Sequence, residues 1–317
     1  MAVWRRSGAR ERRRELMRDA LDGLSVGDAL GAQFFLMGQS IPELRAGRPP
    51  AGPWVWTDDT EMAACLVAEL HVRDEVDQDR LAAVFARRCD PARDYGHATV
   101  TTLRRIREGA HWRAAAGASF GGQGSCGNGA AMRVAPLGAF YAQEPERLVA
   151  EAIRSAQVTH LHPEGVTGAV AVAVAAGEAA RARSTGMRPG PGEFLATVLE
   201  RLEPGETTRA LHRARALLGV SVADAVRELG NGSRVTAQDT VPFALWAAAT
   251  HLANYPAAIT ACIEADGDRD TTGAIVGGIV AAYTGIGDRP GVIGVPPAWR
   301  SAREPLPAWL DPRGRGR

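Results

Sequence analysis

Residues 162–183 contain a long run rich in alanine and valine, which includes the sequence GAVAVAVAAGEAA. Its valines alternate as they would in a strand, but the length of the run favours a helix. Most other segments also show helical periodicity, and almost none shows strand alternation bounded by turns. The sequence therefore predicts an all-α protein, with helices over residues 11–37, 59–73, 79–88, 129–141, 145–157, 162–183, 191–202, 206–218, 221–229, 241–252, 255–265 and 271–284.

No long linker divides the chain, so we expect one helical domain over residues 11–285. Residues 184–192 are the loosest internal stretch, and we interpret them as a surface loop because related motifs lie on both sides of them. Residues 286–317 are rich in proline, glycine and arginine, which predicts an irregular C-terminal tail.

The composition is that of an ordinary globular protein, with 45% hydrophobic residues and a net charge of +1 over 317 residues. This balance does not call for nucleic acid or an anionic membrane as a partner. No stretch of about 18 apolar residues is present, and the arginine-rich N-terminus lacks the apolar run of a signal peptide, so no membrane span is expected. The four cysteines are scattered without a paired motif, which favours a reducing, cytoplasmic location.

Two acidic clusters stand directly before helical segments: WTDDTE at 56–61 and DGDRDTT at 266–272. Helix capping alone could explain either cluster, because Asp and Thr are preferred N-caps. However, one cap needs one acceptor, and several like charges close together are unfavourable without a compensating cation. Carboxylate and hydroxyl oxygens suit Mg²⁺. If the clusters converge, they could hold two ions about 3.5–4 Å apart, as in two-metal hydrolytic sites.

The spacing of Asp266, Asp268 and Asp270 also suggests a calcium-binding EF-hand loop, but that pattern fails. The loop requires glycine at its sixth position and glutamate at its twelfth. Thr271 and Gly277 occupy those positions here. The helix behind this cluster is rich in glycine and alanine, which permits close approach to neighbouring helices.

Residues 121–133 read GGQGSCGNGAAMR, a glycine-rich loop that runs into a predicted helix. Such a loop can present backbone N–H groups to a phosphate, although a plain surface loop is an equally good interpretation. His160 and His162 share the turn that follows Thr159. The sequence leaves open whether His160 faces a site or is a buried structural residue.

Five motifs occur in a fixed order: GDALG at 27–31, TDDT at 57–60, GNGAAMR at 127–133, TH at 159–160 and GDRDT at 267–271. In this order they resemble the ADP-ribosylglycohydrolase family, over about residues 16–285. The resemblance implies a single all-α domain of roughly orthogonal helices with a binuclear Mg²⁺ or Mn²⁺ centre. It also implies a hydrolase that removes ADP-ribose from a modified acceptor.

Where a motif of this chain matches one of the family, the resemblance implies the same role for its residues. The implied metal ligands are Thr57, Asp58, Asp59, Asp268, Asp270 and Thr271. The residues implied to hold the pyrophosphate of ADP-ribose are Gly127, Asn128, Gly129 and Ala130. Asp28 and His160 lie in motifs that border the substrate cleft of the family.

The chain departs from the family pattern in the segment after GDALG. Many relatives carry a glutamate there that contacts the reacting ribose or water, whereas this chain has Phe35. Some bacterial members use an aspartate before the glycine loop instead, and Asp94 could take that place or could be a turn residue after Pro91. Arg269 also stands where many members have a small polar residue.

The implied reaction is attack of an activated water on the anomeric carbon of the distal ribose, through an oxocarbenium-like transition state. Asp59, Asp270 or Asp94 could accept the proton, and the sequence does not rank them. The acceptor that carries ADP-ribose could be a protein, a nucleic acid or a small molecule. Three other hypotheses remain: a non-catalytic ADP-ribose or nucleotide binder, a structural protein on the same fold, and a different metal hydrolase such as a phosphoesterase.

Overall fold

The computed structural model describes residues 2–310 and is built from α-helices and short 3₁₀ turns. This part of the chain contains no β-strand, only isolated bridges between single residues. The predicted all-α class is therefore confirmed. The helices of the first half are α1 (Ala2–Gln33), α2 (Ile41–Arg45), α3 (Asp58–Arg73), α4 (Gln78–Arg88), α5 (His97–Arg107), α6 (Trp112–Gly117), α7 (Ala135–Phe140) and α8 (Pro145–Gln157).

The second half contains the helices of the core and its outer layer. They are α9 (Pro163–Thr185), α10 (Pro191–Leu199), α11 (Glu206–Ala216), α12 (Val222–Leu229), α13 (Ala237–Thr250), α14 (Tyr255–Glu264), α15 (Arg269–Thr284) and α16 (Pro297–Ala302). Three 3₁₀ turns lie between α4 and α7: η1 (Pro91–Arg93), η2 (Ser119–Gly122) and η3 (Asn128–Ala130). None of the described helices combines the length and the hydropathy that a membrane crossing requires.

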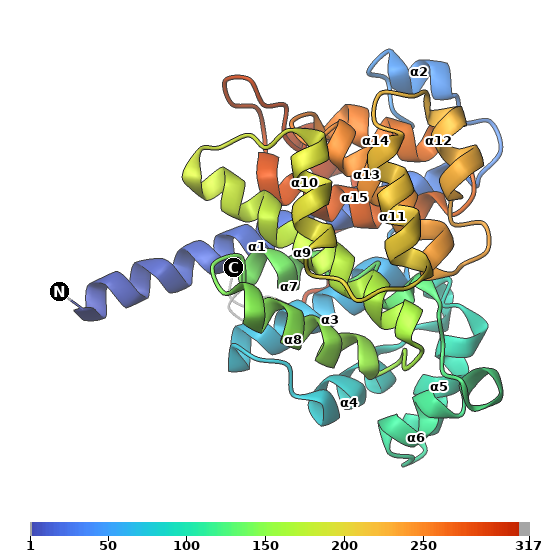
Figure 1. Ribbon diagram of the computed structural model, residues 1–317. Coiled ribbons are helices and arrows are strands. Elements are labelled where there is room, and N and C mark those ends of the chain that lie inside the picture. Colours follow the sequence, from blue (N-terminus) through green and yellow to red (C-terminus); the bar gives the residue numbers. More distant parts are fainter. Residues whose placement is uncertain (1, 311–317) are drawn as a thin grey trace.

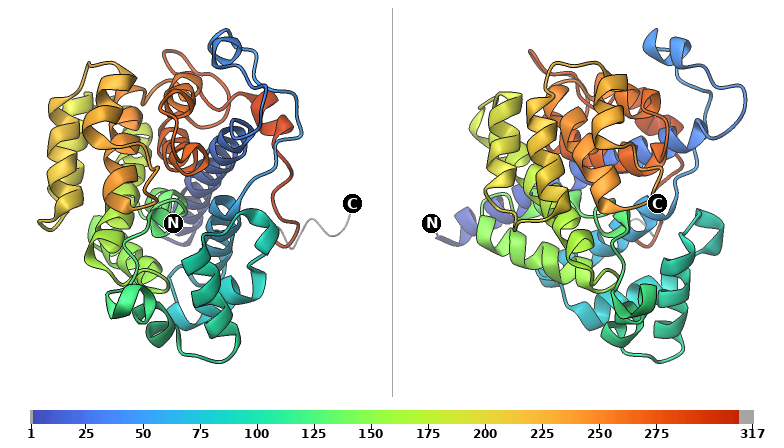
Figure 2. Two further views of the ribbon diagram at one scale, coloured as in Figure 1. Left: turned by 90° about the vertical axis from the view of Figure 1, so that its right-hand side faces the viewer. Right: turned by 45° about the vertical axis from the view of Figure 1, so that its right-hand side comes forward.

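The centre of the fold is the contact between α1 and α15, the most extensive between any two helices. The two run side by side through the middle of the molecule, while the N-terminal part of α1 projects beyond the other helices (Figures 1 and 2). Glycines allow the close approach: a Cβ on Gly23 would lie only 2.5 Å from the carbonyl oxygen of Gly277. The small residues of α15 thus pack backbone against backbone, as their sequence suggested.

The alanine- and valine-rich run forms α9, which confirms the helix predicted there. Its side chains are buried over most of its length, against α7, α8, α13 and α15. A helix that is apolar all round lies in the interior of a protein. This explains why the segment shows no polar face and why its valines could alternate as in a strand.

The predicted helix over 129–141 is wrong at its start, because η3 covers Asn128–Ala130 and α7 begins only at Ala135. The Asn128 side chain donates to Asp268 Oδ2 (2.6 Å) and to Thr240 Oγ1 (3.0 Å), which ties the segment to other elements. The helix α5 was not predicted. Thr102 and Leu103 are its only buried residues, so only a small part of this helix packs against the core.

The described part of the predicted tail is ordered against the helices. It contains α16, which the sequence did not predict, and Trp299 of this helix is buried. The Trp299 ring makes edge contacts with Trp54, at a centroid distance of 6.2 Å, and with Tyr255, at 6.3 Å. Residues 311–317 of the predicted tail lie outside the described residues.

Candidate metal centre and cleft

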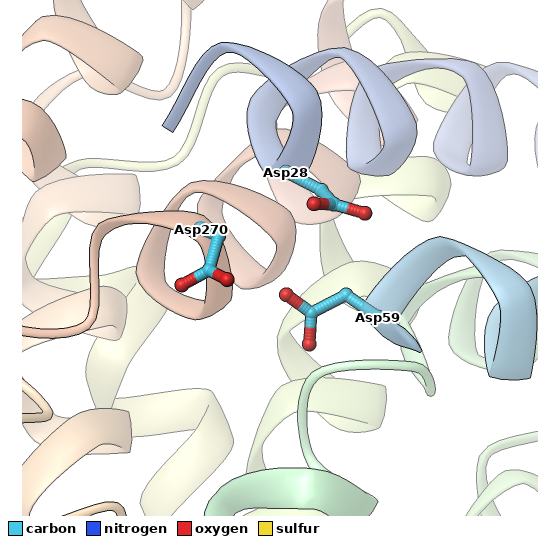
Figure 3. A group of neighbouring side chains, drawn as sticks. All are labelled: Asp28, Asp59 and Asp270. Carbon is cyan, nitrogen blue, oxygen red and sulfur yellow. The ribbon is translucent and has the colours of Figure 1, made fainter. Parts of the chain in front are cut away.

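Three helices bring a carboxylate each to one buried place. Asp28 comes from α1, Asp59 from the first turn of α3 and Asp270 from the first turn of α15 (Figure 3). One carboxylate oxygen of each lies within 4.8 Å of the other two. The Thr271 hydroxyl of α15 donates to Asp59 Oδ1 (3.4 Å), so the two acidic clusters meet although they are far apart in sequence.

Asp28 is completely buried and holds the N-terminus of α3 against α1. Its carboxylate accepts hydrogen bonds from the backbone N–H groups of Thr57 (3.0 and 3.1 Å) and Thr60 (3.1 Å). It also accepts hydrogen bonds from both hydroxyls, with the Thr57 contact at 2.9 Å. The first turn of α3, which carries the first acidic cluster, is thereby fixed to α1.

Ionisation of these buried carboxylates is unfavourable when no cation is bound beside them. Burial raises the pKa of Asp28 to about 6, opposed by the hydrogen bonds from Thr60 and Thr57. Burial and the negative charges of Asp28 and Asp270 raise the pKa of Asp59 well above its usual value. The pKa values of Asp58 and Asp270 are raised in the same way, first by burial and then by neighbouring carboxylates.

Among the side chains that the structure describes, no positive charge compensates this cluster. None of the arginines or histidines described from residue 10 to residue 310 forms an ion pair with Asp28, Asp59 or Asp270. Arg269 lies next to Asp270 in sequence, but it pairs with Asp266 (2.8 Å) and donates to the carbonyl oxygen of Phe34 (2.7 Å). A set of clustered hard oxygen donors without a protein cation fits Mg²⁺ or Mn²⁺.

A cleft of about 510 Å³ opens beside the acidic turns. Of the residues predicted for the site, the cleft is lined by Asp58, Asp94, Gly127, Asn128, Gly129, His160, Asp268, Asp270 and Thr271. Asp58 and Asp268 therefore share one cavity, as the sequence interpretation required. Thr57, Asp59 and Ala130 are buried behind its wall, as is Asp28.

His160 lies beneath the glycine loop. A Cβ on Gly127 would meet its Nε2 at 3.3 Å, and a Cβ on Gly129 would meet its Cε1 at 3.1 Å, so glycine lets the loop lie against the ring. The Thr159 hydroxyl accepts a hydrogen bond from Arg133 Nη2 (3.0 Å) and shares a second one with His160 Nδ1 (2.7 Å). In the tautomer in which the hydroxyl donates to Nδ1, the other ring nitrogen, Nε2, carries the proton and is an N–H donor. Burial and the Arg133 charge lower the pKa of His160 to about 3, which keeps the ring neutral.

Phe120 and Val235 also line the cleft, and the sequence did not single them out. Both are exposed, at 61% and 56%, and both have positive φ angles, 52° and 56°. Bulky residues rarely adopt this backbone conformation. Phe120 directly precedes the glycine-rich segment, and this neighbourhood is the only feature of the sequence that could have indicated a place at the cleft. Val235 gives no signal in sequence.

Phe35 and Asp94 lie at the cleft as well. The Phe35 side chain is 51% exposed, and the Arg269 guanidinium lies 5.8 Å from its ring centroid. Asp94 is exposed with a φ of 63°, and its charge contributes to the raised pKa of Asp58. The position where the resemblance leads us to expect a glutamate is therefore apolar, while the Asp94 carboxylate lies at the same cleft.

Known proteins resemble the chain over most of its length. The family described as ADP-ribosylglycohydrolase matches residues 9–313. The ADP-ribosylhydrolase ARH3 of Gallus gallus is 29% identical, over 90% of this chain and 88% of its own, and that of Homo sapiens is 30% identical, over 78% and 74%. The ADP-ribosyl-[dinitrogen reductase] glycohydrolase of Rhodospirillum rubrum is 33% identical over 44% of this chain and 50% of its own. A solved structure titled ADP-ribosylglycohydrolase-related protein complex aligns with a TM-score of 0.64 and 27% identity, over 93% of this chain and 94% of its own.

Proposed function

This chain belongs to the ADP-ribosylglycohydrolase family, and from that membership we propose that its cleft releases ADP-ribose from a modified acceptor with the help of two divalent cations. One observation carries the proposal: Asp59 and Asp270, from two distant acidic turns, meet at the wall of a cleft that also contains the glycine loop. Fold and family together indicate a hydrolase acting on ADP-ribosylated substrates.

The cations, Mg²⁺ or Mn²⁺, would be held by the hydroxyl and carboxylate oxygens of Thr57, Asp58, Asp59, Asp268, Asp270 and Thr271. When bound, such ions would fix the ribose hydroxyls and lower the pKa of a water molecule. We assign Asp28 chiefly to holding the first turn of α3, because Thr57 and Thr60 already occupy its acceptors. Its negative charge would still add to the attraction for a cation.

The glycine loop would hold the diphosphate. The backbone amides of Gly127 and Asn128 already donate to Ser125 Oγ (3.1 Å) and to the carbonyl oxygen of Val235 (3.2 Å). The Gly129 amide and the His160 Nε2–H group beneath it are the donors that we assign to the phosphate oxygens. A neutral imidazole that donates suits this role, because it binds an anion without changing its own charge. The adenine base would then lie between Phe120 and Val235 at the other end of the cleft.

Asp94 is our choice for the residue that takes the proton from the attacking water. Asp59 and Asp270 are buried and would serve as metal ligands, whereas the Asp94 carboxylate is exposed at the cleft. A general base must be able to reach the water and to accept its proton. Its position on the cleft wall would let it replace the glutamate that Phe35 displaces.

Hydrolysis of differently linked conjugates tests the proposal. ADP-ribose attached to arginine, to serine, to a nucleic-acid base and to a small molecule would be incubated with the protein in Mg²⁺, Mn²⁺ or chelator. We expect metal-dependent release of ADP-ribose from at least one conjugate. We expect an Asp94→Asn variant to lose about 100-fold or more in kcat, the usual contribution of a positioned base. Release of inorganic phosphate instead would indicate a phosphoesterase.

A non-catalytic ADP-ribose binder is the second candidate, and Phe35 at the position of the family glutamate favours it. Binding of ADP-ribose without turnover of any conjugate would support this candidate. Binding alone should be measured by the rise in melting temperature with ADP-ribose, in Mg²⁺ and in chelator. Stabilisation that is equal in both conditions would argue against a sugar site organised by metal.

A further inference from the structure

The loop that carries Asp94 is fastened on both sides of this residue. Asp94 follows η1 and has a φ of 63°, a conformation that costs free energy for a residue with a side chain. Such a conformation persists only where neighbouring contacts impose it. The contacts come from Arg93 and Tyr95, the residues immediately before and after Asp94.

Arg93 connects three parts of the chain. Its guanidinium forms a bidentate pair with Glu304, from Nη1 to Oε2 (2.7 Å) and from Nη2 to Oε1 (3.0 Å). It also donates to the carbonyl oxygen of Trp56 (3.0 Å), and its central carbon lies 3.4 Å from the centroid of the Trp56 ring. Trp56 directly precedes Thr57, the N-cap of α3, so one side chain ties the Asp94 loop to the first turn of α3, which carries Asp58 and Asp59 and is called the metal turn below.

Glu304 lies in the C-terminal segment 302–305, whose backbone is held in place by Trp54 and Trp56. The backbone of Trp54 donates to the carbonyl oxygen of Ala302 (2.7 Å) and accepts from the Glu304 amide (2.8 Å). The Trp56 indole N–H donates to the carbonyl oxygen of Pro305 (3.2 Å). The carboxylate of Glu304 is therefore presented to Arg93 from a fixed backbone. Paired, planar groups of this kind impose a geometry as well as an attraction.

Tyr95 is fastened from α3. Its hydroxyl donates to Glu61 Oε2 (2.7 Å), and the same oxygen accepts from the Asp90 amide (3.1 Å). Glu61 lies one turn along α3 from Asp58, on the helix that begins with the metal turn. The Asp94 loop is therefore connected to the N-terminal part of α3 at two points, by the contact of Arg93 with Trp56 and by the hydrogen bond of Tyr95 to Glu61.

We propose that Glu304, acting through Arg93, is a positioning residue that sets where the Asp94 carboxylate stands relative to the metal turn. The inference rests on the proposed function, because it gives the C-terminal segment a role in the reaction assigned to Asp94. Glu304 does not line the cleft, so its effect passes through the loop. Small displacements of a reacting group are costly, since a shift of about 1 Å can reduce a rate about 100-fold.

The test is a double-mutant cycle between Glu304→Gln and Asp94→Asn, with kcat and KM measured on the conjugate that the wild-type protein hydrolyses. In the wild-type background we expect Glu304→Gln to lower kcat about tenfold with little change in KM. In the Asp94→Asn background we expect it to have less than about a twofold effect, because the group that it positions is gone. A merely structural role would lower kcat equally in both backgrounds and would overturn the proposal.

The matched control is Glu43→Gln, which breaks another arginine–glutamate pair, with Arg48, on the distant helix α2. We expect it to leave kcat unchanged. Hydrogen exchange of residues 90–96 provides a readout that needs no substrate: it should accelerate in Glu304→Gln and not in Glu43→Gln. Unchanged exchange together with unchanged kcat would overturn the inference. Accelerated exchange in a protein that hydrolyses no conjugate would instead keep the positioning and reject the proposed function.

Discussion

Gly27 of α1 and Gly273 of α15 face each other with no room for a side chain on either. A Cβ on Gly27 would lie 2.1 Å from the Gly273 carbonyl oxygen, and a Cβ on Gly273 would lie 2.5 Å from that of Gly27. Asp28 follows the first glycine, and Asp270 lies one turn before the second. The backbone contact between these helices is therefore what brings the two carboxylates into one cluster.

The Gly27→Ala substitution should destabilise the protein and weaken its affinity for Mg²⁺. The added methyl group must push α1 and α15 apart, and overpacking of this kind costs typically about 1–3 kcal/mol. Urea unfolding and calorimetric Mg²⁺ titration measure the two effects. Gly8→Ala is the matched control in the same helix, where nothing lies within 4 Å of the added Cβ. It should be neutral or stabilising by up to about 1 kcal/mol. Equal behaviour of the two variants would contradict the tight contact.

The double substitution Asp59→Asn and Asp270→Asn should abolish tight Mg²⁺ or Mn²⁺ binding while the far-ultraviolet circular dichroism stays helical. The amides are close in shape to the carboxylates but supply neither the charge nor the full set of acceptors. Asp224→Asn, at a partly exposed position on α12 that does not line the cleft, is the control and should bind metal as the wild-type does. Undiminished metal binding by the double variant would refute the metal centre.

The metal-free protein should become less stable as the pH rises from about 4 to above 6. The pKa of Asp28 is raised from its usual 3.8 to about 6 in the folded state, so the folded chain binds more protons than the unfolded chain in this window. The stability that protonation contributes is present at low pH and is lost as the pH passes the folded-state pKa. The raised pKa values of Asp58, Asp59 and Asp270 act in the same direction.

Melting temperatures in chelator and in excess Mg²⁺, measured between pH 5 and 8, check this prediction. The stabilisation by Mg²⁺ should grow with pH, because only the ionised carboxylates bind the ion. The Asp59→Asn and Asp270→Asn double variant should show a weaker dependence on pH in chelator. A metal-free protein that is more stable at pH 7.5 than at pH 5.5 would contradict the electrostatic account of the cluster.

Helices with clear periodicity and residues within motifs could be predicted from the sequence. Roles that depend on contacts between distant helices could not. The predicted helix over 145–157 coincides with α8, whose apolar residues fall on one face after a proline at its start. Asp58, Asp59, Asp268 and Asp270 were predicted as site residues because several oxygen donors stand together in each acidic cluster. The role of Asp28 was not visible, because a single aspartate within a helix says nothing about Thr57 and Thr60 until α1 and α3 meet.

The C-terminal segment shows the same limit. Its proline- and glycine-rich composition predicted an irregular tail, and composition carries no information about which backbone it will meet. Glu304 is a charged residue in that stretch, and its pairing with Arg93 depends on the bridge between Trp54 and Arg303. Contacts of this kind join residues more than 200 positions apart, beyond the reach of any local pattern.

Phe120→Ala should weaken binding of ADP-ribose more than binding of ribose 5-phosphate. The exposed Phe120 ring lines the same cleft as the acidic turns, and only the larger ligand carries an aromatic base that can stack on it. Stacking of a base on an aromatic side chain is worth about 1–3 kcal/mol, which corresponds to a loss of roughly 5- to 150-fold in affinity. Isothermal titration with both ligands in Mg²⁺ measures the difference. Met187→Ala removes a comparably exposed side chain, 60% against 61%, in the loop between α9 and α10, and should leave both affinities unchanged. If the two ligands lost affinity equally in Phe120→Ala, the base would lie elsewhere and the orientation of ADP-ribose along the cleft would have to be reversed.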